Sequence, residues 1–332
     1  DRTVLQLNKR YNNYDLLRCI CLLGVFFLHT QKDNAFHKCL ASFGTMAVPC
    51  FFMMSGVLNL KTDKAIEFRD WIKKTFRKLI IPWILALLFY LVEGFGFQFL
   101  YTGQIDFSIE VRSLADVGYP TRGWHLWYMY AFVEIYLLVP FLIMLKRRNR
   151  LIFYMMGVAL FLRPYFFETS LPWYLTFFNY LWLYILGDFI YSYCSDLNRT
   201  VRYILTGIFC LLVALQFYNI YMGFYGGQKL GGVEHANVMS LAMILWMIIF
   251  TNMKVKFSTY ALTRYFLPIY ILHIFVGDFW SGILRILHLD AINTWWIIFA
   301  DCFVIFIGCY VLCVSGRYIQ RKVILITDRV KK

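Results

Sequence analysis

The chain has 332 residues, of which 61% are hydrophobic and 20% aromatic. A soluble domain is usually about 45–50% apolar, so this composition, with a mean hydropathy of +0.60, excludes an ordinary soluble protein and indicates a polytopic membrane protein. The net charge of +14 would suit a nucleic-acid partner, but the basic residues gather in loops predicted for one side of a membrane, and we expect no nucleic acid.

A membrane-spanning helix needs about 20 predominantly apolar residues. By this measure the sequence predicts an all-α bundle of about ten transmembrane helices joined by short loops. The predicted ranges are roughly 14–31, 42–60, 79–101, 124–145, 151–168, 173–191, 203–222, 237–252, 265–283 and 294–315. Residues 1–13 form an N-terminal segment, residues 14–315 one transmembrane domain, and residues 316–332 a basic tail. We expect no cleaved signal peptide.

The distribution of Lys and Arg predicts the orientation, because cytoplasmic loops carry an excess of both. With a cytoplasmic N-terminus, one face collects 25 basic residues, including those of the 61–78 and 146–150 loops, and the other face collects 7. Both termini are therefore predicted to be cytoplasmic. Residues 31–41 then belong to the first outer loop.

The first predicted helix carries Asp15, Arg18 and His29. A charge inside a bilayer costs on the order of 2.5–3.5 kcal/mol, so such residues usually have a function. Asp15 and Arg18 are spaced i,i+3, which allows a local ion pair at a helix end as well as ligand binding. His29 lies roughly 16 Å beyond Arg18 along the helix axis and titrates near neutral pH.

Five short motifs in chain order resemble the acyltransferase-3 family of integral membrane O-acyltransferases. They are Asp15-Leu-Leu-Arg18 with His29 eleven residues on, FFMMSGVL at 51–58, KKTFRKLIIP at 73–82, WHLWYMYAFVEIYLLVP at 124–140 and LPIYILH at 267–273. The resemblance implies transfer of an acyl group, often acetyl, from cytoplasmic acyl-CoA (acetyl-CoA) to a hydroxyl of an extracytoplasmic carbohydrate or polysaccharide. It also implies a bacterial cytoplasmic (inner) membrane, contact with membrane lipids and no metal.

A binding site for the acyl-CoA phosphates is expected at the cytoplasmic end. Its candidate residues are Arg10, Asp15, Arg18, Lys73, Lys74 and Arg77. Ordinary positive-inside charge accounts for most of these residues without a ligand. Arg18 and Arg77 match family positions. Lys74 stands where the family often has arginine, and lysine keeps the charge but loses bidentate geometry.

The catalytic candidates are His29 and Glu134. Acyl transfer from a thioester requires deprotonation of the attacking hydroxyl, which an imidazole performs well near neutral pH. Glu134 is expected to orient or stabilise His29, as the third member of a triad does, or else to pair with a buried Arg or Tyr. Many family members carry Glu-Gln-Phe-Tyr where this chain has Glu134-Ile135-Tyr136.

Other residues have expected supporting roles. His273, which follows Tyr270 in the late motif, makes a structural hydrogen bond or donates to an oxyanion. Ser55 belongs to a small-residue pair that allows helices to approach closely. The aromatic residues expected at the outer surface either bind the acceptor or form the interfacial aromatic belt. They are Trp124, His125, Trp127 and Tyr128.

Three other functions stay open. A transporter or flippase of a lipid-linked sugar predicts two related halves with helices broken by Gly or Pro, and we see no such halves. A transferase acting on polyprenyl-linked sugars needs acidic residues in the first outer loop, where only Asp33 occurs. The third is a non-catalytic partner with the same fold.

The sequence leaves several properties of the protein undecided. The nine cysteines fall mostly in apolar runs, so we expect no disulfide framework. The sequence does not decide the identity of the acyl group, the identity of the acceptor sugar or whether the chain forms a homo-oligomer. Transfer is either direct or passes through a second protein, because no further catalytic domain is apparent.

Overall fold

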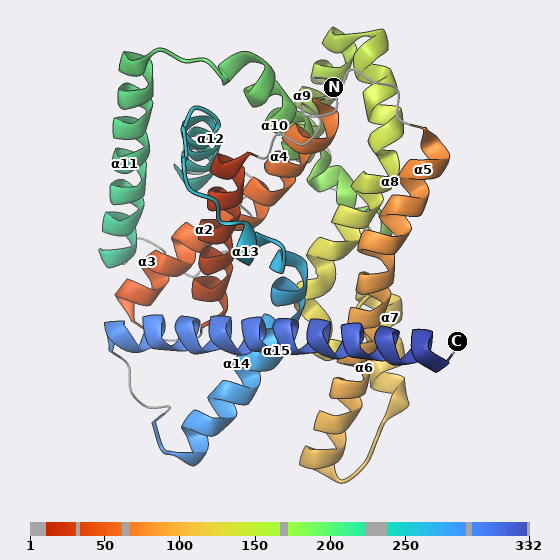
Figure 1. Cartoon of the computed structure of the whole chain (residues 1–332). Helices are drawn as coiled ribbons and strands as arrows, with labels where there is room; N and C mark the ends of the chain where they lie inside the picture. The colour runs from red at the N-terminus through yellow and green to blue at the C-terminus, as the bar shows by residue number, and fades with distance from the viewer. Residues whose placement is uncertain are drawn as a thin grey trace. The chain divides into compact units, whose positions relative to one another are not determined.

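The computed structural model describes residues 11–30, 34–61, 67–166, 172–222, 238–289 and 294–330. Every regular element within these ranges is a helix (Figure 1), which confirms the all-α prediction. The chain divides into two compact units. The first unit comprises Asp1–Val48 and Leu197–Lys332, and the second comprises Pro49–Asp196.

The first unit is built from both ends of the chain. Its helices are α2 (Asn12–His29), α3 (Ala35–Gly44), α11 (Arg199–Tyr221), α12 (Val238–Thr251), α13 (Tyr260–Thr263), α14 (Phe266–Ile286) and α15 (Trp295–Val330). Helices α2, α14 and α15 share an apolar core formed by Leu22, Phe26, Tyr265, Ile269, Val276, Cys302, Ile305 and Cys309. Burial of this core holds the first and last helices of the described chain together.

The second unit is a continuous stretch of helices. In chain order these are α4 (Ala47–Leu60), α5 (Phe68–Thr75), the π-helical turn η1 (Phe76–Ile80), α6 (Ile81–Thr102), α7 (Phe107–Val117), the 3₁₀ helix η2 (Thr121–Leu126), α8 (Trp127–Arg148), α9 (Arg150–Phe166), the 3₁₀ helix η3 (Trp173–Asn179) and α10 (Leu181–Cys194). Helices α4 and α10 are in backbone contact. A Cβ added at Gly56 would overlap the Tyr184 carbonyl, and one added at Gly187 would overlap the Met53 carbonyl. The small residue beside Ser55 thus permits a close helix approach.

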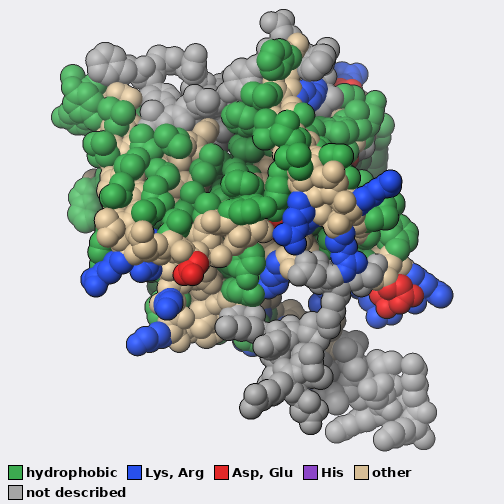
Figure 2. All heavy atoms as spheres, turned by 90° about the horizontal axis from the view of Figure 1, so that it is seen from above, with side chains coloured by type: hydrophobic (Ala, Val, Ile, Leu, Met, Phe, Trp, Pro, Cys, Tyr) green, Lys and Arg blue, Asp and Glu red, His purple; other side chains and the backbone are tan. Residues whose placement is uncertain are grey.

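Among the described residues, six helical stretches are long and apolar enough to cross a membrane. They are Ala35–Leu60, Phe68–Thr102, Phe107–Arg148, Arg199–Tyr221, Phe266–Ile286 and Trp295–Gln320. Hydrophobic side chains cover much of the face seen in Figure 2, and Lys and Arg lie toward its margins. The protein is therefore an integral multi-pass membrane protein. The count of ten spans and the cytoplasmic termini stay predictions, although each predicted range overlaps a helix.

Three details of the predicted elements are wrong. Residues 35–44 form the separate helix α3, which Asn34 caps by accepting a hydrogen bond from the His37 N–H at 2.7 Å. Helix α15 continues to Val330, so most of the predicted basic tail is helical. Lys146, predicted in a loop, lies in the last turn of α8 and is buried.

Candidate active site

The two imidazoles of His29 and His273 lie side by side in the first unit. His29 is the last residue of α2 and His273 lies within α14, and their ring centroids are 5.1 Å apart. His273 is buried and His29 is half-buried. The ring of Phe26, one turn before His29, lies 5.8 Å from the ring of His273. Packing of α2 against α14 therefore brings together two histidines from opposite ends of the chain.

A backbone contact fixes the tautomer of His273. Its Nδ1 lies 2.5 Å from the carbonyl oxygen of Tyr270 on the same helix. Because a carbonyl oxygen can only accept, Nδ1 carries the proton and Nε2 of the neutral ring is an acceptor. His273 thus makes a hydrogen bond within its own helix, and its role in the reaction stays a prediction.

Asp15 and Arg18 form the ion pair that their spacing allows. Arg18 Nη1 lies 3.1 Å from Asp15 Oδ1, and Asp15 is buried whereas the Arg18 side chain is 28% exposed. The pair gives each charge at this end of α2 a partner, and part of the Arg18 side chain stays exposed. Arg10 lies outside the described residues.

The predicted basic segment is exposed in the second unit. Lys73 and Lys74 lie in the last turn of α5, and Arg77 lies in η1. The π-helical turn precedes Pro82, whose ring cannot fit a regular α-helical ladder. The segment is attached to α8 because Trp71 Nε1 donates to the Tyr136 carbonyl at 2.7 Å.

Glu134 is held by backbone of its own unit. The side chain is half-buried, and its Oε2 accepts a hydrogen bond from the Phe177 N–H of η3 at 3.2 Å. The carboxylate therefore has a structural partner, which is neither the Arg nor the Tyr considered from the sequence. His29 belongs to the first unit and Glu134 to the second, so their pairing stays a prediction.

The four predicted acceptor residues do not form one exposed aromatic surface. Trp124 is 42% exposed and Trp127 is half-buried. His125 is buried with its ring edge-on to Tyr90 at 4.8 Å, and Tyr128 is also buried. His125 lies in η2 and Tyr128 lies in α8, and both are buried in the second unit, so their contact with an acceptor stays a prediction.

A buried carboxylate that was not predicted from the sequence lies at the start of η2. Glu110 is fully buried and accepts hydrogen bonds from the Thr121 N–H at 3.0 Å and the Thr121 hydroxyl at 2.5 Å. Thr121 is the first residue of η2, the helix that carries Trp124 and His125. Glu110 thus fixes the start of that helix. Its isolated position in α7 gave no sequence signal.

A buried ion pair was also missed. Lys146 Nζ donates to Asp188 Oδ1 at 2.7 Å and to the Leu60 carbonyl at 2.9 Å. The hydroxyl of Tyr154 donates to Asp188 Oδ2 at 3.0 Å. These contacts join α4, α8, α9 and α10 and satisfy both charges.

The described part of the chain contains no assembled metal site and no disulfide bond. No group of three His, Cys, Asp or Glu side chains there is placed to hold a metal ion. The nine cysteines are free thiols.

A protein-family profile described as an acyltransferase domain matches residues 11–314. The chain belongs to the acyltransferase-3 family. No curated protein and no solved structure matches it. The acyltransferase domain spans nearly all the described helices, and six stretches of them can cross a membrane. This member of the acyltransferase-3 family is therefore a membrane acyltransferase.

Proposed function

We propose that this acyltransferase moves an acyl group, expected to be acetyl, from cytoplasmic acyl-CoA to a hydroxyl of an extracytoplasmic carbohydrate of a bacterial cell envelope, with His29 as general base. The observation that carries the proposal is the contact between His29 and His273. An imidazole pair within an acyltransferase domain supplies a proton acceptor and a second group that supports it.

The reaction balances with one proton transfer. His29 takes the proton of the acceptor hydroxyl as its oxygen attacks the thioester carbon. The carbon–oxygen bond of the ester forms, the carbon–sulfur bond breaks, and the imidazolium returns the proton to the departing CoA thiolate. His273, held as the Nδ1–H tautomer by Tyr270, presents an acceptor nitrogen that favours the imidazolium of His29.

We assign the basic residues to binding of the acyl-CoA donor. Arg18, with its guanidinium oriented by Asp15, and the exposed Lys73, Lys74 and Arg77 bind the phosphates of CoA. Arginine suits a phosphate because its planar donors bind two oxygens at once. Arg10 is assigned to the same group from the sequence.

We assign the aromatic residues in and near η2 to binding of the acceptor carbohydrate. Trp124 exposes an apolar ring on which a sugar can stack. The buried His125 and Tyr128 support the segment from beneath, and Trp127 flanks it. Glu134, bonded to η3, is assigned to support His29.

The test uses the purified full chain in proteoliposomes. Release of the CoA thiol and labelling of a cell-envelope polysaccharide fraction are followed with radiolabelled acetyl-CoA on either side of the membrane. We expect transfer only when donor and acceptor are on opposite sides, and a large loss in His29→Ala. Equal activity of the two proteins, or no activity in either, would refute the proposal.

A further inference from the structure

The second unit contains an ion pair that the proposed reaction does not use. Arg122 Nη2 lies 3.5 Å from Glu93 Oε1, and the two side chains are 29% and 8% exposed. The guanidinium also lies over the ring of Phe97, with its Cζ 4.0 Å from the ring centroid. Arg122 precedes Trp124 by two residues in η2. The pair therefore lies in the segment that the proposed function gives to the acceptor.

Packing of η2 against one face of α6 fixes this pair. Tyr90, Glu93 and Phe97 share a face of α6, because helical residues three or four apart lie one above the other. Arg122 and His125 share a face of η2, since a 3₁₀ helix has three residues per turn. Arg122 thus meets Glu93 and Phe97, and the ring of His125 meets that of Tyr90 at 4.8 Å.

Two exposed aromatic rings belong to the same two elements. Tyr101 continues this face of α6, and its ring stacks on that of Phe97 with centroids 5.5 Å apart. Tyr101 is 74% exposed and Trp124 is 42% exposed. The rings alone would also fit an interfacial aromatic belt. The part-exposed ion pair beside Phe97 adds the few placed polar groups that a ligand site needs and a belt does not.

An ion pair offers a sugar hydroxyl both a donor and an acceptor without a net charge. A guanidinium only donates and a carboxylate only accepts, whereas a hydroxyl does both. Arg122 can therefore donate to a hydroxyl oxygen while Glu93 accepts from a hydroxyl proton. A carboxylate on the acceptor would meet Glu93 as a like charge, which is strongly unfavourable at a binding surface.

The charge of the surrounding elements also disfavours an acidic acceptor. Residues 81–126, which run from the start of α6 to the end of η2, carry four carboxylates and two guanidinium groups. Their net charge is −2, in a chain whose net charge is +14. Such a field repels anions over about 8 Å at physiological ionic strength. An uncharged acceptor does not meet this repulsion.

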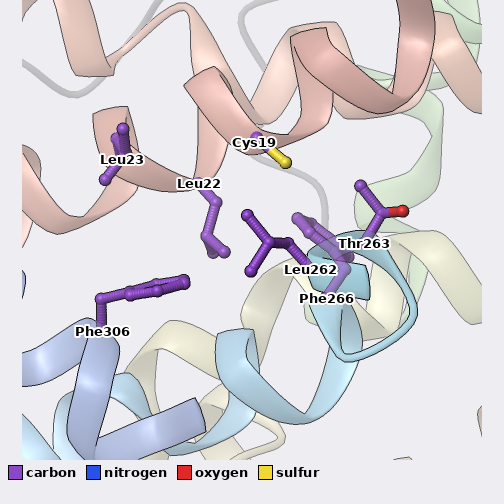
Figure 3. A pocket seen from close by; sticks show the side chains of 7 residues that line it. All are labelled: Cys19, Leu22, Leu23, Leu262, Thr263, Phe266 and Phe306. Carbon is purple, nitrogen blue, oxygen red and sulfur yellow. The ribbon is translucent and has the colours of Figure 1, made fainter. Parts of the chain in front are cut away.

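The apolar cavity of the first unit does not suit such a ligand. Its volume is about 200 Å³. Figure 3 shows its lining, in which only Cys19 and Thr263 carry a polar side-chain atom. The hydroxyls of a carbohydrate would lose most of their hydrogen bonds there. The ion pair of the second unit supplies such partners.

We propose that Arg122 and Glu93 bind hydroxyls of the acceptor, so that the acceptor class is an uncharged carbohydrate. Tyr101 and Trp124 contact the apolar faces of its rings. The inference rests on the proposed function, because it names the substrate class of the acceptor site near η2. Glu93 is the residue that discriminates against sugars with a carboxylate.

The experiment measures kcat/KM for acetyl transfer by the purified full chain in nanodiscs. Three acceptor preparations are compared: a neutral and an acidic fraction of cell-envelope polysaccharide, separated by anion exchange, and the acidic fraction after chemical reduction of its carboxyl groups to alcohols. We expect the neutral fraction to be preferred to the acidic one by roughly tenfold or more. Carboxyl reduction should restore transfer to the acidic fraction.

Two amide substitutions separate ligand binding from a structural role. Glu93→Gln leaves the cation without its counter-charge, so the ratio of acidic to neutral kcat/KM should rise roughly tenfold or more. Arg122→Gln should lower kcat/KM for the neutral fraction by roughly tenfold and leave KM for acetyl-CoA unchanged. Asp116→Asn and Arg112→Gln make the same charge changes at exposed positions of α7 and should keep the wild-type values.

Thermal unfolding of each variant accompanies the kinetics. A pair that only anchors η2 to α6 would lower kcat/KM for both fractions alike and leave their ratio unchanged in Glu93→Gln. That result overturns the uncharged-acceptor site alone, as does a wild-type protein that acylates the acidic fraction as well as the neutral one. Failure of the wild type to acylate any of the three preparations overturns the proposed function and this inference with it.

Discussion

Lys146 and Asp188 form an ion pair inside the second unit, with Nζ 2.7 Å from Oδ1. The Lys146 side chain is 11% exposed and that of Asp188 is 0% exposed. Because the Leu60 carbonyl and the Tyr154 hydroxyl complete their hydrogen bonds, neither charge is left uncompensated. The pair therefore ties four helices together through a single carboxylate and ammonium.

Removing one member of this pair should destabilise the protein strongly. Asp188→Ala leaves a buried ammonium without its carboxylate, and the expected loss is about 3–5 kcal/mol of unfolding free energy. The double variant Lys146→Met/Asp188→Leu removes both charges and should recover much of the loss. Thermal unfolding of the purified protein compares the three. Equal melting temperatures for wild type and Asp188→Ala would show that the pair does not stabilise the unit.

The close approach of α4 and α10 predicts that Gly56→Ala and Gly207→Ala change the melting temperature differently. Gly56→Ala places a methyl group against the Tyr184 backbone and should lower the melting temperature, by the equivalent of about 1–3 kcal/mol of overpacking. Gly207 in α11 has no atom within 4 Å of an added Cβ, so Gly207→Ala should be neutral or slightly stabilising. The same response in both variants would contradict the packing described here.

Glu110 is expected to position the acceptor segment. Glu110→Ala leaves the Thr121 N–H without its acceptor, at a cost of about 1–3 kcal/mol. We expect a higher KM for the acceptor with little change in KM for acyl-CoA, and partial rescue in Glu110→Gln. Asp116→Ala, at an exposed position of α7, serves as control. A Glu110→Ala protein with wild-type acceptor KM would argue against this role.

Arg77 is expected to act on the donor. Arg77→Glu should weaken acyl-CoA binding by roughly tenfold or more, as expected for loss of one charge-assisted hydrogen bond. Arg112→Glu makes the same charge change at an exposed position of α7 and should have little effect. Isothermal titration with CoA measures both affinities. Similar losses in the two variants would point to general surface charge instead of a phosphate site.

Much of the helical organisation follows from local sequence. Every predicted span overlaps a helix, because apolar length is a local property. Helix α3 escaped prediction because residues 34–41 mix polar and apolar side chains, and their helix depends on the Asn34 cap and on packing of Gly44 against Gly24.

The sequence allowed the candidate site residues to be chosen, but not their burial or their contacts with one another to be predicted. Lys146 begins a Lys-Arg-Arg run that resembles an ordinary cytoplasmic loop, and only contact with Asp188 reveals its burial. His29 and His273 were each recognised, but their contact depends on the packing of α2 against α14. Pairings between residues far apart in the chain leave no trace in one sequence.

Replacing His29 with Asn and measuring single-turnover acyl transfer tests the general-base role of this imidazole, with acyl-CoA affinity determined separately by titration. His288→Asn is the matched control, because His288 is exposed and has a φ of 56°, which Asn tolerates. We expect His29→Asn to bind acyl-CoA normally and to transfer about 10²–10⁴-fold more slowly, while His288→Asn retains the wild-type rate. A His29→Asn protein that binds the donor and transfers at the wild-type rate would contradict a general base at this position.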